Sequence, residues 1–251
     1  MLISGSICNG NERKTMDELT EHQKQRMIEA GRAVLNMSHG IKNTLQAIGS
    51  GRDVMDEALD RSNIDVAKRT WGILKQNLER IEKLSLDMLK FSKDEAVNLK
   101  PCHFNHLVES AVETMRPQAE QRQVTIINQT EAQLEATPLD AEKMRDVVIN
   151  LLVNAIEAVE PNTGQILVQT ELDKDGQQVV LRVSDNGKGI ENTDPIFEPF
   201  YSTKDNVGAG LGLTIAQKIV QKHGGTLCAQ SLPDEGAVFT VCIPMSAEET
   251  A

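Results

Sequence analysis

The sequence predicts an α+β protein in which a long helical hairpin precedes an α/β sandwich. Apolar residues recur every three or four positions over 17–59 and again over 64–92, which is typical of two amphipathic helices. Beyond Pro101, shorter helical patterns are mixed with segments in which every second residue is apolar, as in strands. Aromatic residues are scarce, with one Trp and one Tyr, and this favours helix packing and a small mixed sheet over an all-β fold.

The same patterns predict the domain limits. We expect a flexible leader at 1–16, a hairpin domain at 17–96, a second domain at 97–247 and a short tail at 248–251. A lone hairpin leaves both of its apolar stripes half exposed. We therefore expect two copies to pair as a four-helix bundle, which makes the protein a homodimer.

In the second domain, a helix is expected to begin after Asp140, a residue whose side chain suits the N-cap position. Asp175-Gly176 predicts a tight hairpin turn between two strands. The predicted helices span 105–123, 140–159 and 211–223, and the predicted strands span 124–128, 134–137, 166–172, 179–183, 226–231 and 237–243. Helices and a mostly antiparallel sheet are thus segregated, which favours a sandwich.

Composition excludes several classes of protein. A net charge of −11 argues against nucleic acid as a partner, because binding to phosphate backbones needs a basic surface. The four cysteines are far apart and form no CxxC pair, so we interpret them as buried free thiols of a reducing compartment. The chain has no apolar run of membrane-spanning length and no secretion signal at its start, so we expect a cytoplasmic protein.

The first predicted helix carries a histidine on its polar side. Its apolar stripe consists of Val34, Met37, Ile41, Leu45 and Ile48 and continues with Met55 and Leu59. At about 100° per residue, His39 lies about 165° from the middle of this stripe and is expected to face solvent. An exposed imidazole that titrates near neutral pH can act as a nucleophile or a phosphoryl acceptor. The alternative is a surface histidine without a role.

Asn150, Asn154 and Glu157 form a polar ridge on an otherwise apolar helix, because residues at i, i+4 and i+7 share one face. Such a ridge must meet water, a ligand or a metal. Amide oxygens suit Mg²⁺, which takes oxygen ligands and commonly bridges phosphates. The ridge is therefore either a magnesium site or a solvated face.

Two glycine-containing stretches also suggest a ligand. Asp185 ends a strand and begins Asp-Asn-Gly-Lys-Gly, in which Gly187 and Gly189 allow backbone to approach a ligand closely. The carboxylate can accept a hydrogen bond from an exocyclic amine such as that of adenine, or the stretch is an ordinary turn. The second stretch, Gly-Ala-Gly-Leu-Gly over 208–212, opens a helix whose first N–H groups can cradle phosphate. It matches neither a Walker loop nor a dinucleotide-binding fingerprint.

Between these stretches, Ile-Phe-Glu-Pro-Phe-Tyr-Ser-Thr-Lys at 196–204 suggests a mobile lid. Phe197 and Phe200 would be its aromatic anchors, and Lys204 could reach a terminal phosphate. The alternative is a loop that simply packs on the core.

Taken in order, the five stretches resemble the five sequence boxes of sensor histidine kinases, and they cover nearly everything from Asp17 to Ile243. Details such as Asn-Ala-x-Glu at 154–157 and Phe-Tyr-Ser-Thr-Lys at 200–204 are similar to the nitrogen-regulator-like branch of these kinases. The resemblance implies a Bergerat-type (GHKL) sandwich that binds ATP and Mg²⁺, as in gyrase, Hsp90 and MutL.

The resemblance also implies roles for individual residues. His39 matches the phosphoacceptor, Asn150 and Asn154 match the magnesium-binding asparagines, and Lys204 matches the lid cation. The residues implied in nucleotide binding are Asn150, Asn154, Glu157, Asp185, Gly187, Gly189, Phe197, Phe200, Thr203, Gly208, Gly210, Leu211 and Gly212. Related ATPases have a glutamate that activates water where Asn150 stands, so transfer to His39 is favoured over hydrolysis.

Two departures from the family pattern bear on activity. Gly40 stands where most members have an acidic residue that takes the imidazole proton, and Thr44 stands where the branch has proline. Asn43 matches a position that often assists dephosphorylation of the partner.

The expected function is autophosphorylation of His39 by ATP, followed by transfer to an aspartate of a response regulator. The alternatives are a phosphatase-dominant protein and a non-kinase ATP-binding scaffold. The stimulus, the cognate regulator and cis or trans transfer stay open.

Overall fold

The computed structural model describes residues 21–93, 95–131, 134–173, 175, 177–201, 210–232 and 235–245. Side chains are described from Ser38 onward, His39 and Leu232 excepted. The predicted leader at 1–16 and tail at 248–251 lie outside these residues, as does Gly176 of the predicted hairpin turn.

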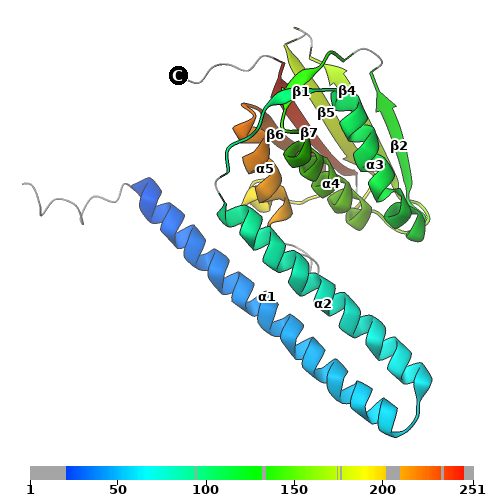
Figure 1. Cartoon of the computed structure of the whole chain (residues 1–251). Helices are drawn as coiled ribbons and strands as arrows, with labels where there is room; N and C mark the ends of the chain where they lie inside the picture. The colour runs from blue at the N-terminus through cyan, green and yellow to red at the C-terminus, as the bar shows by residue number, and fades with distance from the viewer. Residues whose placement is uncertain are drawn as a thin grey trace, which may run out of the picture.

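The first half of the structure is the predicted helical hairpin (Figure 1). Helix α1 spans Glu21–Asp60 and α2 spans Ile64–Ser92. Asn63 caps α2, because its side-chain oxygen accepts a hydrogen bond from the Val66 N–H at 3.2 Å. Ala58 and Ala67 are buried on either side of the turn, and such small side chains let the two helices approach closely.

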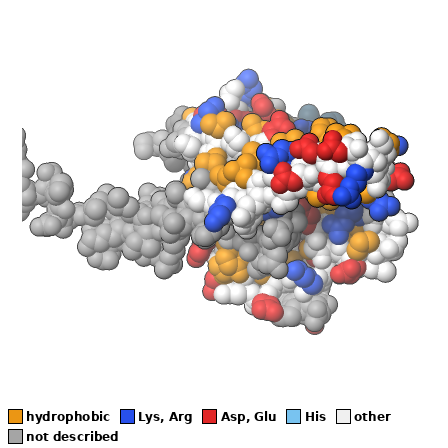
Figure 2. Space-filling view, turned by 90° about the horizontal axis from the view of Figure 1, so that it is seen from below, with side chains coloured by type: hydrophobic (Ala, Val, Ile, Leu, Met, Phe, Trp, Pro, Cys, Tyr) orange, Lys and Arg blue, Asp and Glu red, His pale blue; other side chains and the backbone are white. Residues whose placement is uncertain are grey.

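Large apolar side chains lie exposed on the outer surface of the hairpin. Trp71, for example, is 57% exposed. The others on the two helices are Leu45, Val54, Leu59, Ile64, Ile73, Leu78, Leu86 and Leu89. Seen from below, hydrophobic side chains reach the surface among charged ones (Figure 2). One hairpin therefore leaves much of its apolar surface in water, as the stripes in the sequence predict.

The second half is an α/β sandwich, which confirms the predicted fold class. Its sheet has the strand order β2-β4-β5-β7-β6, and β2–β4 is its one parallel pair among the described residues. The strands are β2 Thr125–Thr130, β4 Gln165–Leu172, β5 Gln178–Asp185, β6 Thr226–Leu232 and β7 Gly236–Pro244. Helices α3 Phe104–Gln121, α4 Ala141–Ala158 and α5 Gly212–Lys222 cover one face of this sheet (Figure 1).

The core lies between these helices and the sheet. Val108 of α3 and Leu151 of α4 are completely buried, as are Val168 of β4 and Leu181 of β5. Alternate residues of β4 and β5 are buried, because successive side chains of a strand point to opposite faces of the sheet. None of the described helices is long and apolar enough to cross a membrane.

The structure corrects three details of the sequence analysis. A short strand β1, Lys100–Cys102, pairs with β3, Thr137–Leu139, whereas we expected a strand at 134–137 and none at 100–102. This pairing joins segments far apart in the chain, so no local pattern shows it. The cysteines are not all buried: Cys228 is exposed on β6, and Cys102 and Cys242 are half-buried.

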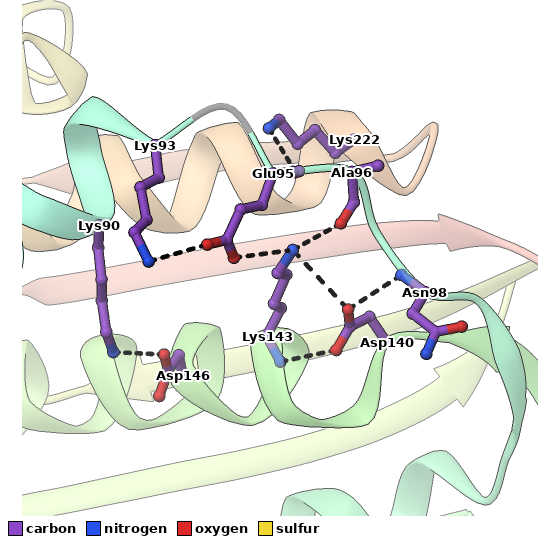
Figure 3. Close-up of polar contacts among 9 residues, drawn as sticks. All are labelled: Lys90, Lys93, Glu95, Ala96, Asn98, Asp140, Lys143, Asp146 and Lys222. Atoms are coloured by element: carbon purple, nitrogen blue, oxygen red, sulfur yellow. Dashed lines mark hydrogen bonds and ion pairs between the residues drawn. The ribbon is translucent and has the colours of Figure 1, made fainter.

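The linker after α2 is fixed to the sandwich by polar contacts at the start of α4 (Figure 3). Asp140 is the predicted N-cap of α4, and its carboxylate accepts hydrogen bonds from the Lys143 and Asn98 N–H groups at 3.2 and 3.0 Å. Lys143 Nζ donates to the Ala96 carbonyl at 2.7 Å, and Lys222 Nζ donates to the Glu95 carbonyl at 2.8 Å. One capping residue thus orders both the helix and the linker.

Candidate functional site

A cleft opens where α4, the end of β5 and the start of α5 meet. Six of the residues predicted to bind a ligand line it: Asn150, Asn154, Asp185, Gly189, Gly210 and Gly212. These residues come from three stretches that are separated by as many as 62 positions in the sequence. The sandwich therefore gathers the asparagine ridge and both glycine stretches around one cavity.

Asp185 is held in place by the turn that follows it. It ends β5, is only 9% exposed, and its Oδ1 accepts a hydrogen bond from the Gly187 N–H at 2.9 Å. A Cβ on Gly187 would lie 2.6 Å from the Ala158 carbonyl oxygen and 2.8 Å from Asp185 Oδ1. Both contacts are closer than Cβ atoms come in proteins, so this position requires glycine for space.

Ser231 of β6 fixes the other side of this turn, and sequence reasoning did not identify it. Its hydroxyl accepts a hydrogen bond from the Ile190 N–H at 2.7 Å and donates one to the Gly236 carbonyl at 2.7 Å. A serine on an alternating strand carries no local signal for such a bridge. The hydrogen bonds of Ser231 form only because the fold places β6 beside the turn.

The asparagines lie one helical turn apart on α4, half-buried, and both face the cleft. A Cβ on Gly212 would lie 3.3 Å from Asn150 Oδ1, so α5 begins close against this amide. The N-cap residue of α5 is Leu211, which offers no side-chain acceptor to the first N–H groups of the helix. Free N–H groups at a helix N-terminus suit an anionic ligand.

The described part of the segment predicted as a lid, residues 196–201, is held to the sandwich by two hydrogen bonds. The Phe200 N–H donates to the Gly210 carbonyl at 2.9 Å, and the Thr214 hydroxyl donates to the Phe197 carbonyl at 3.0 Å. Tyr201 lines the cleft, whereas Phe197 packs against the core and Phe200 against Phe91 of α2. The predicted residues Thr203, Lys204 and Gly208 lie outside the described residues.

Three further predicted residues do not line the cleft directly. Glu157 is half-buried on α4, Gly187 packs behind Asp185, and Leu211 is completely buried beneath the start of α5. Sequence reasoning also missed most of the apolar lining: Val153, Ala158, Ile190, Ile196, Leu213, Ala237 and Phe239. Their spacing was indistinguishable from that of ordinary core residues.

His39 lies in α1, and its side chain is outside the description, so its predicted orientation is untested. Asn43, one turn further along α1, is exposed. Two charged residues of α2, Lys83 and Asp87, line the same cleft as Asn150 and Asn154, which no sequence pattern predicted.

The chemistry of the cleft fits a nucleotide. A carboxylate in a largely apolar pocket can accept a hydrogen bond from an exocyclic amine, and the apolar lining suits a planar base. The amide oxygens of Asn150 and Asn154 are ligands that Mg²⁺ accepts, and they lie beside the N-terminus of α5. One cleft thus holds both a carboxylate that suits a base and amide oxygens that suit a metal ion.

Comparison with known proteins agrees with this geometry. Residues 139–247 match the family described as histidine kinase-, DNA gyrase B- and HSP90-like ATPases. The matched segment contains α4, the cleft residues of the sandwich and α5. The chain therefore contains a domain of this ATPase family.

Over most of its length the chain is also homologous to sensor histidine kinases. It is 29% identical to the signal transduction histidine-protein kinase AtoS of Escherichia coli K12, over 89% of this chain and 36% of AtoS. It is 27% identical to the sensor histidine kinase ZraS of Klebsiella oxytoca, over 94% of this chain and 50% of ZraS. The chain thus spans half or less of the length of these two relatives.

Solved structures show the same arrangement. The histidine kinase ThkA in complex with the response regulator protein TrrA matches with a TM-score of 0.76 and 26% identity, over 90% of this chain and 65% of that one. The Acinetobacter baumannii histidine kinase AdeS shares the fold with a TM-score of 0.64 at 19% identity, over 83% of this chain and 98% of AdeS. Hairpin and sandwich together are therefore a known combination. The nitrogen-regulator-like assignment stays a prediction.

Proposed function

We propose that this chain is an ATP-dependent protein-histidine kinase that phosphorylates its own His39. The phosphoryl group would then pass to an aspartate of a response regulator receiver domain in the cytoplasm. The observation that carries the proposal is a nucleotide-type cleft in an ATPase-family domain, joined in one chain to a helical hairpin that bears a histidine. Homology to AtoS and ZraS, and the likeness to ThkA bound to TrrA, support it. We further propose that the hairpin domain spans 17–96 and the ATP-binding domain spans 97–247.

The register of the hairpin supports His39 as the residue that receives the phosphoryl group. A Cβ on Gly51 would lie 2.8 Å from Leu74 Cδ2, so these two residues face each other across the hairpin. The two helices are antiparallel and rise equally per residue. About 13 residues toward the start of α1 from Gly51 lies Ser38, and about 13 residues toward the end of α2 from Leu74 lies Asp87, so Ser38 and Asp87 are at the same height. Asp87 lines the cleft, and the backbone of His39 is therefore near that height.

The predicted site residues would have distinct parts in this reaction. Asp185 would accept a hydrogen bond from the exocyclic amine of adenine, and the N–H groups at the start of α5 would bind phosphate oxygens. Asn154 and Asn150 would hold Mg²⁺, which supplies charge neutralisation on the phosphates. Lys204 would add a further positive charge from the lid. Binding and positioning thus account for most of the catalysis.

The phosphoryl step forms a bond between an imidazole nitrogen of His39 and the γ-phosphorus. The bond from phosphorus to the bridging β–γ oxygen breaks, and ADP leaves with that oxygen. The amide of Asn150 cannot accept a proton from water, so hydrolysis is disfavoured. The imidazole must also lose a proton, and Gly40 offers no carboxylate for it. A slow autophosphorylation rate follows from this.

The test is labelling with ATP that carries radioactive γ-phosphate, in Mg²⁺, of the wild type, His39→Gln and His106→Gln. His106 is exposed on α3 outside the cleft and serves as the matched control. We expect acid-labile, base-stable label on the wild type and on His106→Gln, and none on His39→Gln. Label that persists in His39→Gln, or its absence from a wild type that binds ATP, would contradict the kinase proposal.

We also propose that the exposed apolar surface of the hairpin is covered by a second copy, giving a homodimer. The support is the exposure of large apolar residues along both helices, such as Leu45 on α1 and Trp71 and Leu78 on α2. A charge there prevents burial, so Trp71→Glu should shift the mass measured by light scattering from dimer to monomer. Lys75→Glu, on the same helix, is the control.

Phosphatase activity toward the response regulator is the second candidate. Asn43 is exposed one turn after His39, where its amide could orient water on a phosphorylated partner. We expect Asn43→Ala to slow loss of label from a phosphorylated receiver domain while leaving autophosphorylation unchanged. Equal dephosphorylation by wild type and variant would exclude this role.

A further inference from the structure

The last turns of α2 are docked against both helices that flank the cleft. Lys90 Nζ lies 2.6 Å from an Asp146 carboxylate oxygen of α4. On the other side, Lys218 Nζ of α5 lies 3.6 Å from the centre of the Phe91 ring and donates to the Phe91 carbonyl at 3.3 Å. The Phe91 ring also meets Phe200 edge-on, with 6.2 Å between ring centres. These contacts fix the position of α2.

Because α2 is held there, two of its charged side chains become part of the cleft. Lys83 and Asp87 line it together with Asn150, Asn154 and Gly212. The two residues are four positions apart and therefore share one face of the helix. Of the described residues that line the cleft, the charged ones are Lys83, Asp87, Asp185 and Lys188. The hairpin thus supplies half of the charged lining.

The two side chains differ in hydration, because Lys83 is exposed and Asp87 is not. The Asp87 side chain is half-buried, and loss of hydration raises the pKa of its carboxyl group. The charges of Lys83 and Lys90 lower this pKa, and that of Asp146 raises it, but burial is the largest influence. In such a partly dehydrated position, charges act on a bound anion more strongly than in open water.

We propose that Lys83 and Asp87 are specificity-determining residues of the cleft, and that through them the hairpin adjusts affinity for the phosphate chain of a nucleotide. Lys83 attracts the nucleoside triphosphate and Asp87 repels it, so the two side chains act in opposite directions on one ligand. The inference rests on the proposed function, because it takes the ligand to be a nucleotide. It extends the binding site beyond the ATPase-family segment at 139–247.

The arrangement links nucleotide binding to the hairpin. Any movement of α2 relative to the sandwich changes the distance of Lys83 and Asp87 from the phosphates and hence the affinity. By linkage, a bound nucleotide must favour one position of α2 to the same extent. The hairpin and the cleft are then two parts of one coupled site.

The experiment is calorimetric titration of the full chain, in Mg²⁺ and low salt, with three ligands: the non-hydrolysable analogue AMPPNP, ADP and adenosine. The variants are Lys83→Gln and Asp87→Asn, each of which removes one charge at nearly constant size. The matched controls are Lys75→Gln and Glu82→Gln, which remove the same charges from exposed positions of α2 that do not line the cleft.

We expect Lys83→Gln to weaken AMPPNP binding by about three- to tenfold and Asp87→Asn to strengthen it by about the same factor. Adenosine affinity should change less than about twofold in both variants, and the controls should match the wild type. Effects that shrink in high salt would support a charge effect.

Changes in the same direction in both variants would indicate a structural disturbance and overturn the proposal, as would unchanged AMPPNP affinity. A wild type that binds no nucleotide at all would instead contradict the proposed function. Thermal unfolding of each variant shows whether the fold is intact.

Discussion

Replacing Gly187 by alanine tests whether the turn after β5 positions Asp185 for binding. The added methyl group would lie 2.6 Å from the Ala158 carbonyl oxygen and 2.8 Å from Asp185 Oδ1. Carbon and oxygen atoms pack comfortably at about 3.5 Å, so the turn must move by nearly 1 Å. The Ala158 oxygen is backbone at the end of α4 and cannot yield as a flexible side chain would.

The displacement has two expected consequences. Overpacking of this size costs about 1–3 kcal/mol of folding stability. A carboxylate that moves by about 1 Å also loses its hydrogen bond to the ligand, which is worth about 1.5–3 kcal/mol for a charged group. Adenine nucleotide affinity should therefore fall by about 10- to 100-fold.

The assay is calorimetric titration with ADP, alongside thermal unfolding. Gly224→Ala is the control, because Gly224 has a φ of 70° after α5 and does not line the cleft. That variant should lose about 1–2 kcal/mol of stability from backbone strain and keep its ADP affinity. The reasoning fails if Gly187→Ala binds ADP as tightly as the control does.

Three further predictions concern His223, Phe91 and Gly40. Burial lowers the pKa of His223, whose Nε2 accepts from the Asp140 N–H at 3.0 Å and whose Nδ1 lies 2.7 Å from the Ile219 carbonyl. The neutral ring of His223 contributes fully to folding stability above pH 6.5, the ordinary pKa of histidine. This contribution is lost as the pH falls toward the lower pKa of His223 in the folded protein. Chemical unfolding from pH 7 to 5 should show a smaller stability loss in His223→Phe than in the wild type, and at pH 7 the variant should be about 1–3 kcal/mol less stable. Phe91→Ala should release α2 and increase hydrogen exchange at its last turns, and unchanged exchange would exclude the docking role. Gly40→Glu should raise autophosphorylation by up to about 100-fold, because a Cβ there meets nothing within 4 Å and the carboxylate can take the imidazole proton; an equal rate in wild type and variant would show that proton removal does not limit the reaction.

Periodicity alone determined most of the fold. The three-and-four spacing from Ile64 to near Ser92 predicted α2, and the alternation around Val168 and Leu181 predicted the central hairpin of the sheet. Asp140 was identified as the cap of α4 from its side chain and position alone. These features were predictable because they depend on neighbouring residues in the sequence. A helix or strand must bury one face, and the first N–H groups of a helix need hydrogen-bond acceptors.

The order of the motifs suggested ATP and Mg²⁺ as ligands that residues of separate stretches bind together. The structure brings residues of three stretches to one cleft, and their binding of a ligand stays a prediction. The resemblance carried this expectation, because no spacing in the sequence shows that Asn150, Asp185 and Gly212 meet. Only the tertiary structure revealed the Ser231 bridge, the β1–β3 pair and the exposure of Cys228 on β6. Each depends on which segments become neighbours.

The sequence by itself therefore determined the fold class, and it indicated Asn150, Asp185 and Gly212 as ligand-binding candidates. Only the tertiary structure decided that Lys83 and Asp87 join that cleft, through the contact of Lys90 with Asp146 and of Phe91 with Phe200 and Lys218. On α2 these residues have the pattern of an ordinary charged helix face. A side chain's role in a shared site depends on what packs against it, and residues distant in sequence set that packing.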